Sequence, residues 1–119
     1  MSRYRFAIVV AVLLVFLAVG AYLLNRNKSA IPQNVTFDVT VTGAKSMTPS
    51  ELSAHQNDTI TINITSDTDG EVHLHGYDIA FDTKAGQVVS HTFKAINTGS
   101  FEIEWEATAE RLGDLNVSP

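Results

Sequence analysis

From residue 33 to the end of the chain, apolar and polar residues alternate with a period of two. This pattern is typical of strands that bury one face and expose the other. Five stretches show it clearly, and the positions between their apolar residues are filled mainly by Thr, Asn, His, Asp and Glu. Their apolar members are Val35, Phe37, Val39 and Val41; Ile60, Ile62 and Ile64; Val72 and Leu74; Val89, Phe93 and Ala95; and Phe101, Ile103 and Trp105.

Clusters of Gly, Asn and Asp separate these stretches and mark turns, and Leu115 with Val117 predicts a short closing strand. Six or seven short strands with alternating faces predict an all-β domain, in which two antiparallel sheets pack face to face. Outside the N-terminal block, the only helical signal is one turn expected within residues 106–112. The globular domain is therefore predicted to span residues 31–119.

The N-terminal block has a different pattern, because residues 6–24 contain no charged residue. As a helix this stretch would extend about 28 Å at roughly 1.5 Å per residue, close to the hydrocarbon thickness of a bilayer. Arg3 and Arg5 precede it, and Arg26 and Lys28 follow it. Residues 1–30 are therefore predicted to form a transmembrane or signal helix followed by a linker.

Two interpretations of this block stay open: an uncleaved signal anchor, or a signal peptide cleaved near residues 18–20, where small residues have the spacing a peptidase needs. The apolar run continues beyond that point, which favours the anchor. In both cases the domain is expected outside the cytoplasm, facing the periplasm or the cell exterior, and it would be secreted if the signal is cleaved. The membrane, contacted through residues 6–24, is the first expected partner.

Composition narrows the functions further. The chain of 119 residues has no cysteine, which excludes disulfides, a thiol nucleophile and the Cys thiolate of a blue-copper centre. Residues 31–119 hold all 13 acidic residues but only four of the eight basic ones, a formal charge of −9. Such an acidic domain repels nucleic acids. No phosphate-binding loop, nucleophile elbow or small-molecule site is evident, so we do not expect an enzyme.

The clearest candidate for chemistry is the pair His73 and His75. Residues two apart on a strand point to the same side, about 6.6 Å apart along its axis, so the two imidazoles can approach one metal ion. Gly76, next to them, allows a ligand or another backbone segment to come close. The alternative interpretation is two exposed polar residues on a half-solvated strand.

Two further histidines are weaker candidates. His91 shares a strand face with Val89 and Phe93, where an apolar residue is expected. It is therefore either a hydrogen-bonded histidine of the core, which we favour, or part of an open site. His55 precedes a turn and is expected to lie exposed in a loop.

Glu102, Glu104 and Glu106 form a carboxylate stripe on one strand face. Like charges at this spacing are destabilising unless they are solvated or paired, so a solvated sheet face is the ordinary explanation. In the functional interpretation Glu106, at the end of the strand, supplies an oxygen to a metal held by His73 or His75. Histidine with carboxylate suits Cu(II) or Zn(II) better than Cu(I).

Several motifs together resemble the small bacterial cupredoxin-like domains. The resemblance covers roughly residues 49–119. It is carried by the order and spacing of Gln56-Asn57-Asp58-Thr59-Ile60, His73-Leu74-His75-Gly76-Tyr77-Asp78, Ala85-Gly86-Gln87, Phe93-Lys94-Ala95, Thr98-Gly99-Ser100-Phe101-Glu102-Ile103-Glu104 and Leu112-Gly113-Asp114-Leu115-Asn116-Val117.

This resemblance implies a Greek-key β-sandwich, often exported, with a copper site at one end. The chain departs from the ligand pattern of the family. Residues 103–105 stand where Cys is expected, Glu106 stands where relatives often carry His, and Arg111 stands about where Met would be. A blue-copper electron carrier is therefore excluded, and what remains is a site built on His73, His75 and Glu106.

Two main functions follow from the sequence. In the first, a membrane-anchored extracytoplasmic cupredoxin-like domain binds copper at a non-blue site and handles the metal. In the second, the β-sandwich binds no metal and serves as a structural or interaction module, with its acidic face turned to another protein of the cell envelope. A third interpretation, an enzyme or an accessory subunit of one in which the histidine pair supports redox chemistry, is not favoured because no set of acid, base and nucleophile is visible.

Overall fold

The computed structural model describes residues 31–119, and these contain strands and turns but no helix. They include no helical segment long and apolar enough to cross a membrane. The predicted helix at residues 6–24 lies outside the described residues. The strands are β1 (Asn34–Thr42), β2 (Ser46–Thr48), β3 (Glu51–His55), β4 (Thr59–Ser66), β5 (Gly70–Leu74), β6 (Ile79–Thr83), β7 (Val88–Lys94), β8 (Gly99–Trp105) and β9 (Glu110–Ser118).

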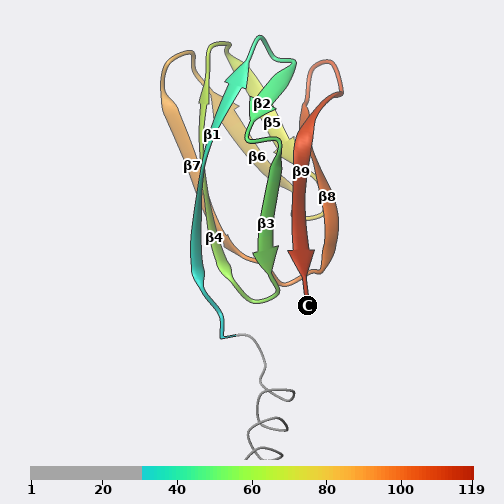
Figure 1. Cartoon of the computed structure of the whole chain (residues 1–119). Coiled ribbons are helices and arrows are strands. Elements are labelled where there is room, and N and C mark those ends of the chain that lie inside the picture. The colour runs from blue at the N-terminus through green and yellow to red at the C-terminus, as the bar shows by residue number, and fades with distance from the viewer. Residues whose placement is uncertain (1–30) are drawn as a thin grey trace, which may run out of the picture. The chain divides into compact units, whose positions relative to one another are not determined.

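The strands form two packed sheets, which confirms the predicted all-β class (Figure 1). One sheet has the order β2-β1-β4-β7, and the other has the order β3-β9-β8-β5-β6. Both sheets are mixed, because β1 runs parallel to β4 and β3 runs parallel to β9. The prediction of two antiparallel sheets was therefore wrong. Alternation reveals which residues face inward, but it carries no information on the direction of the neighbouring strand.

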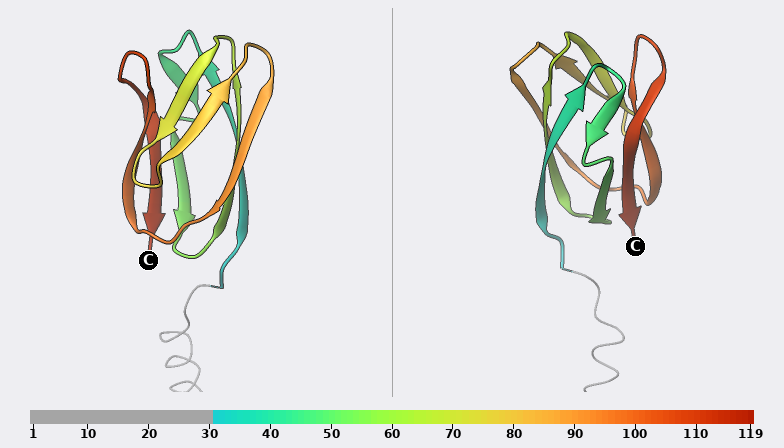
Figure 2. Two further views of the ribbon diagram at one scale, coloured as in Figure 1. Left: turned by 180° about the vertical axis from the view of Figure 1, so that it is seen from behind. Right: turned by 45° about the horizontal axis from the view of Figure 1, so that its top comes forward.

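The parallel pairs follow from the way in which the chain changes sheets. β2 pairs with β1, and β3, which starts only three residues after β2 ends, pairs with β9 in the opposite sheet (Figure 2). Parallel neighbours need a crossover connection, and the segment from β2 to β3 supplies one between β1 and β4. Sequence reasoning missed β2, β3 and β6: β2 has one apolar residue, the alternation of β3 depends on the small Ala54, and β6 begins with three consecutive apolar residues.

The core fills the space between the two sheets with the side chains that the alternation pointed inward. Val39, Ile62, Leu74 and Trp105 are all at most 4% exposed. The C-terminal strand is longer than expected. The predicted helical turn within residues 106–112 was wrong, since residues 106–109 form a turn and β9 begins at Glu110. Residues Pro32–Pro119 thus form a compact unit with a hydrophobic core of their own.

One buried carboxylate ties the start of β1 to the turn between β3 and β4. Asp58 is 2% exposed, and its two oxygens accept backbone N–H groups: Oδ1 from Gln33 at 2.8 Å and Oδ2 from His55 at 2.9 Å. These two hydrogen bonds hold the pKa of Asp58 below its ordinary value, and the bond from Gln33 has the larger effect. The ionised form of Asp58 is therefore the one that stabilises the fold.

We expect Asp58→Asn to destabilise the protein at neutral pH, since an amide nitrogen would face one of the two N–H donors. The folded-state pKa is depressed, so the stabilisation by Asp58 is present above the ordinary carboxyl pKa and is lost as the pH falls through the folded value. The stability difference between the two proteins should therefore shrink between about pH 5 and pH 2. Urea unfolding along a pH series measures it. A difference that does not change with pH would contradict this role.

Candidate metal centre

His73 and His75 lie on the outer face of the five-stranded sheet. Val72 and Leu74 are fully buried, so the alternation of β5 turns the residues between and after them outward. β5 ends at Leu74, but the N–H of His75 still donates to the carbonyl of Glu102 on β8 at 2.9 Å. The two imidazole rings meet edge to face, with centroids 4.5 Å apart. The sequence placed the two histidines on one face without showing whether their rings converge, and in the structure the rings lie together.

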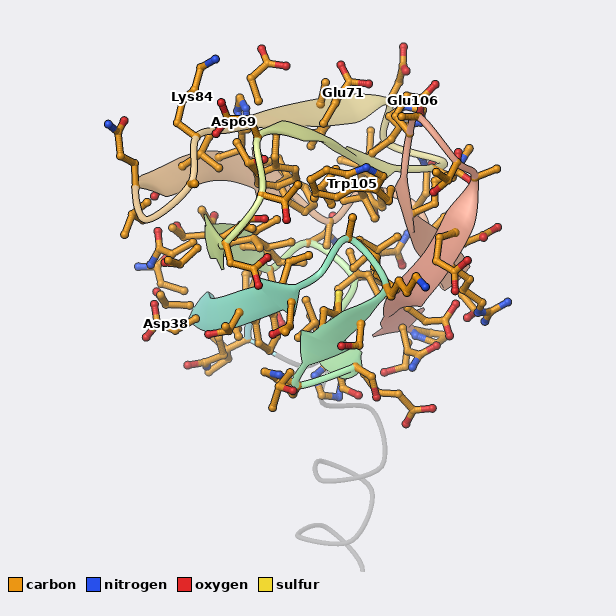
Figure 3. The ribbon with its side chains drawn as sticks, turned by 90° about the horizontal axis from the view of Figure 1, so that it is seen from above. Asp38, Asp69, Glu71, Lys84, Trp105 and Glu106 are labelled. Atoms are coloured by element: carbon orange, nitrogen blue, oxygen red, sulfur yellow. The ribbon has the colours of Figure 1, made fainter. Side chains whose placement is uncertain are left out.

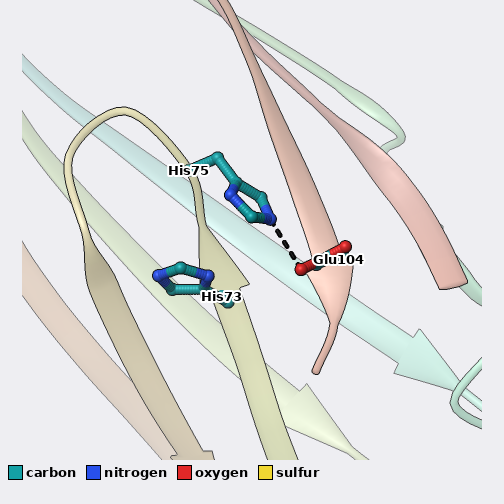
Figure 4. Close-up of side chains that lie close together, drawn as sticks. All are labelled: His73, His75 and Glu104. Atoms are coloured by element: carbon teal, nitrogen blue, oxygen red, sulfur yellow. Dashed lines mark ion pairs between the residues drawn. The ribbon is translucent and has the colours of Figure 1, made fainter. Parts of the chain in front are cut away.

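The third member of the cluster is Glu104. The register of β5 against β8 places it directly opposite His73, and its Oε1 lies 2.6 Å from Nε2 of His75 (Figure 4). The two atoms are at ion-pair distance, but their geometry is not that of a hydrogen bond, so the buried Nε2 of His75 has no hydrogen-bond partner. A buried ring nitrogen without a hydrogen-bond partner calls for an explanation, and a metal ion held between the ring and the carboxylate is one that fits these donors.

Two more carboxylates lie against the other histidine. Nε2 of His73 is 3.0 Å from Oδ1 of Asp78, and its Nδ1 is 3.4 Å from Oε2 of Glu106. Glu106 extends from the strand that ends in the buried Trp105, close to Glu71 (Figure 3). With Glu104, three carboxylates thus surround two imidazoles, and no lysine or arginine pairs with any of the three among residues 31–119. This excess of negative charge favours a cation.

The turn that follows His75 is held in place by Tyr77, which packs on an aromatic ring of β8 and hydrogen-bonds to the loop before β8. The ring of Tyr77 packs edge to face on Phe101, and its hydroxyl donates to the carbonyl of Asn97 at 2.6 Å. Burial raises the pKa of Tyr77, so the hydroxyl stays protonated and able to donate at neutral pH. Gly76 has a φ of +81°, and a Cβ built there would lie 2.2 Å from Cδ1 of Phe101.

We therefore expect Gly76→Ala to disturb the site as well as the fold, because the added methyl group must displace either the Phe101 ring or the turn that carries His75. Gly86→Ala is a matched control, since Gly86 has a φ of +78° and open space where its Cβ would lie. Both variants place an alanine in the left-handed region, which costs about 1–2 kcal/mol. Gly76→Ala should lose clearly more stability in urea unfolding and should also weaken metal binding. Equal losses of stability in the two variants would mean that the Phe101 ring moves aside at no cost and that its contact with Gly76 is unimportant.

The remaining predicted residues lie apart from this centre. His91 is on β7 in the other sheet, paired with Ile62, and its ring stacks edge to face on buried Phe81 at 4.9 Å. It is exposed, so the favoured interpretation as a core histidine was wrong; β7 is an edge strand, and an inward position there stays open to solvent. His55 is exposed as predicted, although it ends β3 and does not lie in a loop.

Sequence reasoning named Glu106 as the carboxylate of the site and assigned Glu104 only to the stripe. The geometry places Glu106 against His73 and adds Glu104, whose oxygen lies within 4.8 Å of a ring nitrogen of each histidine. The signal for Glu104 was present in the sequence, since it belongs to the carboxylate stripe. What was missing was the register between β5 and β8.

The donors of this cluster determine which metals fit. Metal bonds of about 2.0–2.2 Å to nitrogen and oxygen hold neighbouring ligand atoms roughly 3–3.5 Å apart. The ligand atoms of His73, His75 and Glu104 lie within 4.8 Å of one another, so small side-chain rotations would bring them to that spacing. A blue-copper centre does not fit, since the chain has no cysteine and Met47, the only methionine among residues 31–119, is buried in the core. A divalent ion that accepts imidazole and carboxylate ligands does fit.

No family model matches the chain, and no curated protein matches it in sequence. Solved structures do match. The chain is similar to one in the cryo-EM structure of a heme-copper terminal oxidase dimer (TM-score 0.59, 15% identity, 98% of this chain and 99% of that chain covered). It is similar to a copper binding protein solved by NMR in the apo form (TM-score 0.62, 12% identity, 76% and 93% covered).

A third similar structure is the metal binding domain of the Cu(I) exporting P-type ATPase CopA of Streptococcus pneumoniae D39, solved with Cu(I) (TM-score 0.59, 11% identity, 76% and 100% covered). Two of these neighbours are a copper binding protein and a metal binding domain solved with Cu(I), and the third is a chain of a heme-copper oxidase; their likeness supports a cupredoxin-like domain here. With identities of 15% or less, the likeness shows the fold alone.

Proposed function

We propose that this domain binds a divalent copper ion through His73, His75 and Glu104, with Glu106 and Asp78 adding negative charge beside the ion. The observation that carries the proposal is the buried Nε2 of His75, which has no hydrogen-bond partner and lies 2.6 Å from a carboxylate oxygen. A bound cation would interact favourably with both atoms at once. Two of the structural neighbours support copper as the metal, since one is a copper binding protein and the other is the metal binding domain of a Cu(I) exporting ATPase.

The oxidation state follows from the donors. Cu(I) prefers soft sulfur ligands, whereas imidazole and carboxylate suit Cu(II), Zn(II) and Ni(II). Among divalent ions of the first transition row, Cu(II) binds most tightly to a given set of nitrogen and oxygen donors. We therefore expect Cu(II) to displace Zn(II) from this site. The protein would then handle metal and would have no role as a blue-copper electron carrier.

The setting of this function is part of the proposal. The apolar stretch at residues 6–24 supports a membrane anchor or signal, and with it an extracytoplasmic position for the domain. A metal-handling domain tethered at the membrane surface would take up copper outside the cytoplasm. We assign it no catalytic role.

The test is a Cu(II) titration of the purified full chain, without a polyhistidine tag, followed by calorimetry and paramagnetic resonance. We expect one ion per chain at pH 7, with nitrogen hyperfine structure from two imidazoles. Zn(II) should compete, and Cu(II) should win. A Kd no tighter than about 1 mM, equivalent to about −4 kcal/mol, would overturn the proposal.

That outcome would favour the second function, a metal-free interaction module of the cell envelope. The acidic outer face of the five-stranded sheet would then be the expected contact surface. On it, Glu71 and Asp82 lie directly opposite each other as like charges on β5 and β6. A basic partner would relieve their repulsion.

A further inference from the structure

A second feature of the molecule lies on the other sheet, away from the histidine pair. β7 is an edge strand that pairs only with β4 among the described residues. It has seven residues, whereas the other edge strands have three (β2) or five (β3 and β6), so it is the longest unpaired edge. Five of its seven residues are exposed. An unprotected edge of this kind presents free N–H and C=O groups to another strand.

The usual protection against such pairing is weak here. Edge strands are commonly blocked by proline, by bulges or by several charged residues, but β7 contains no proline and no acidic residue, and Lys94 at its end is its single lysine. Val88, at the other end, is 64% exposed. In a domain with a formal charge of −9, an edge strand without acidic residues is where direct like-charge contacts between two copies are fewest.

The sequence of β7 is also complementary to itself. If two copies pair in antiparallel orientation with the two-fold axis at His91, Val89 lies opposite the partner's Phe93, and Ser90 lies opposite the partner's Thr92. The first pair is apolar and lies on the inner face, and the second joins hydroxyls on the outer face. Val88 would pack against the aliphatic stem of the partner's Lys94. Each of these pairings is favourable across strands.

We propose that β7 is a homodimerisation edge, at which a second copy of this chain adds its own β7 and joins the two four-stranded sheets into one. The interface is isologous, as a two-fold dimer requires. The interface is formed by one strand per copy and is therefore small, so we expect a weak dimer. Such a dimer would form where the local concentration of the chain is high, as on a membrane surface to which many copies are tethered. This proposal does not depend on metal binding at His73 and His75.

The absence of cysteine allows a direct test. In an antiparallel pair centred on residue 91, the two Cα atoms would lie about 4.5–5.5 Å apart, within the range of about 4.4–6.8 Å that a disulfide needs. His91→Cys is therefore expected to form a disulfide dimer in the full chain, treated with diamide in the presence of a chelator. Ser53→Cys is the matched control, since Ser53 is the exposed central residue of the edge strand β3.

In a weak dimer the acceleration is the effective concentration of the paired residue divided by the Kd. A millimolar effective concentration and a Kd of about 100 μM should therefore make disulfide formation at position 91 on the order of 10-fold faster than at position 53 at about 10 μM chain. The register is tested with two chains of different tag mass. Ser90→Cys on one should cross-link to Thr92→Cys on the other faster than either cross-links to itself. Equal rates at positions 91 and 53, or no preference between positions 90 and 92, would overturn the proposal.

Discussion

Replacing His75 with alanine is expected to weaken Cu(II) binding by at least about 100-fold, since groups that merely orient a metal ligand are worth about 10–100-fold. The variant removes the buried Nε2 that lies 2.6 Å from Oε1 of Glu104. His73→Ala should cause a similar loss. Calorimetric titration measures the affinity, and paramagnetic resonance should show one nitrogen fewer in each variant.

The controls are the two histidines outside the cluster. His55→Ala and His91→Ala remove exposed imidazoles from β3 and β7, and both should leave the affinity and the spectrum unchanged. If His91→Ala weakened binding as much as His75→Ala, the ligand set would have to include the other sheet. That result would contradict the site described here.

Two variants distinguish Glu104, the proposed ligand, from Glu102, another carboxylate of the same strand. Glu104→Gln keeps the shape of the side chain and removes the charge beside His75, so it should lower Cu(II) affinity by about 10-fold or more. Glu102→Gln removes the same charge from the same strand, at a residue that forms no ion pair with either histidine. It should have a clearly smaller effect. Equal losses would show that general negative charge attracts the ion and that Glu104 is no ligand.

Most of the fold could be predicted because the alternation of this chain is regular. In β1, β4 and β8 the apolar residues at every second position are enough to identify the buried face. Strand direction could not be predicted, since parallel and antiparallel neighbours bury the same side chains. The short strands β2 and β3 were missed because their alternation is weak: β2 has one apolar residue, and one of the two in β3 is the small Ala54.

The site could be predicted to the level of one strand. The spacing of His73 and His75 places both imidazoles on one face of β5, and this needs no knowledge of the tertiary structure. The choice of the carboxylate depends on which residue of β8 lies opposite His73, which is a matter of register between distant segments. For His91 the sequence predicted which face of the strand it occupies but not its exposure to solvent. That exposure arises because β7 is at the edge of its sheet.

The largest effect on stability is expected at Phe81, which is 1% exposed and pairs with Val72 in the five-stranded sheet. Phe81→Ala should destabilise the protein by about 3–5 kcal/mol, because the core loses a whole ring and closes only partly around the space. Phe37→Ala is the matched control, since Phe37 is only half-buried at the margin of the same core.

Urea unfolding of the three proteins gives the comparison. We expect Phe37→Ala to lose less than half as much stability as Phe81→Ala, since a ring that already faces water gives up less on truncation. Small domains are stable by only about 5–15 kcal/mol, so Phe81→Ala can approach the limit of folding. Phe81→Leu keeps most of the volume and should fold with a loss of about 1 kcal/mol. Equal losses for the two alanine variants would mean that the core is centred nearer to β1 than the burial of its side chains indicates.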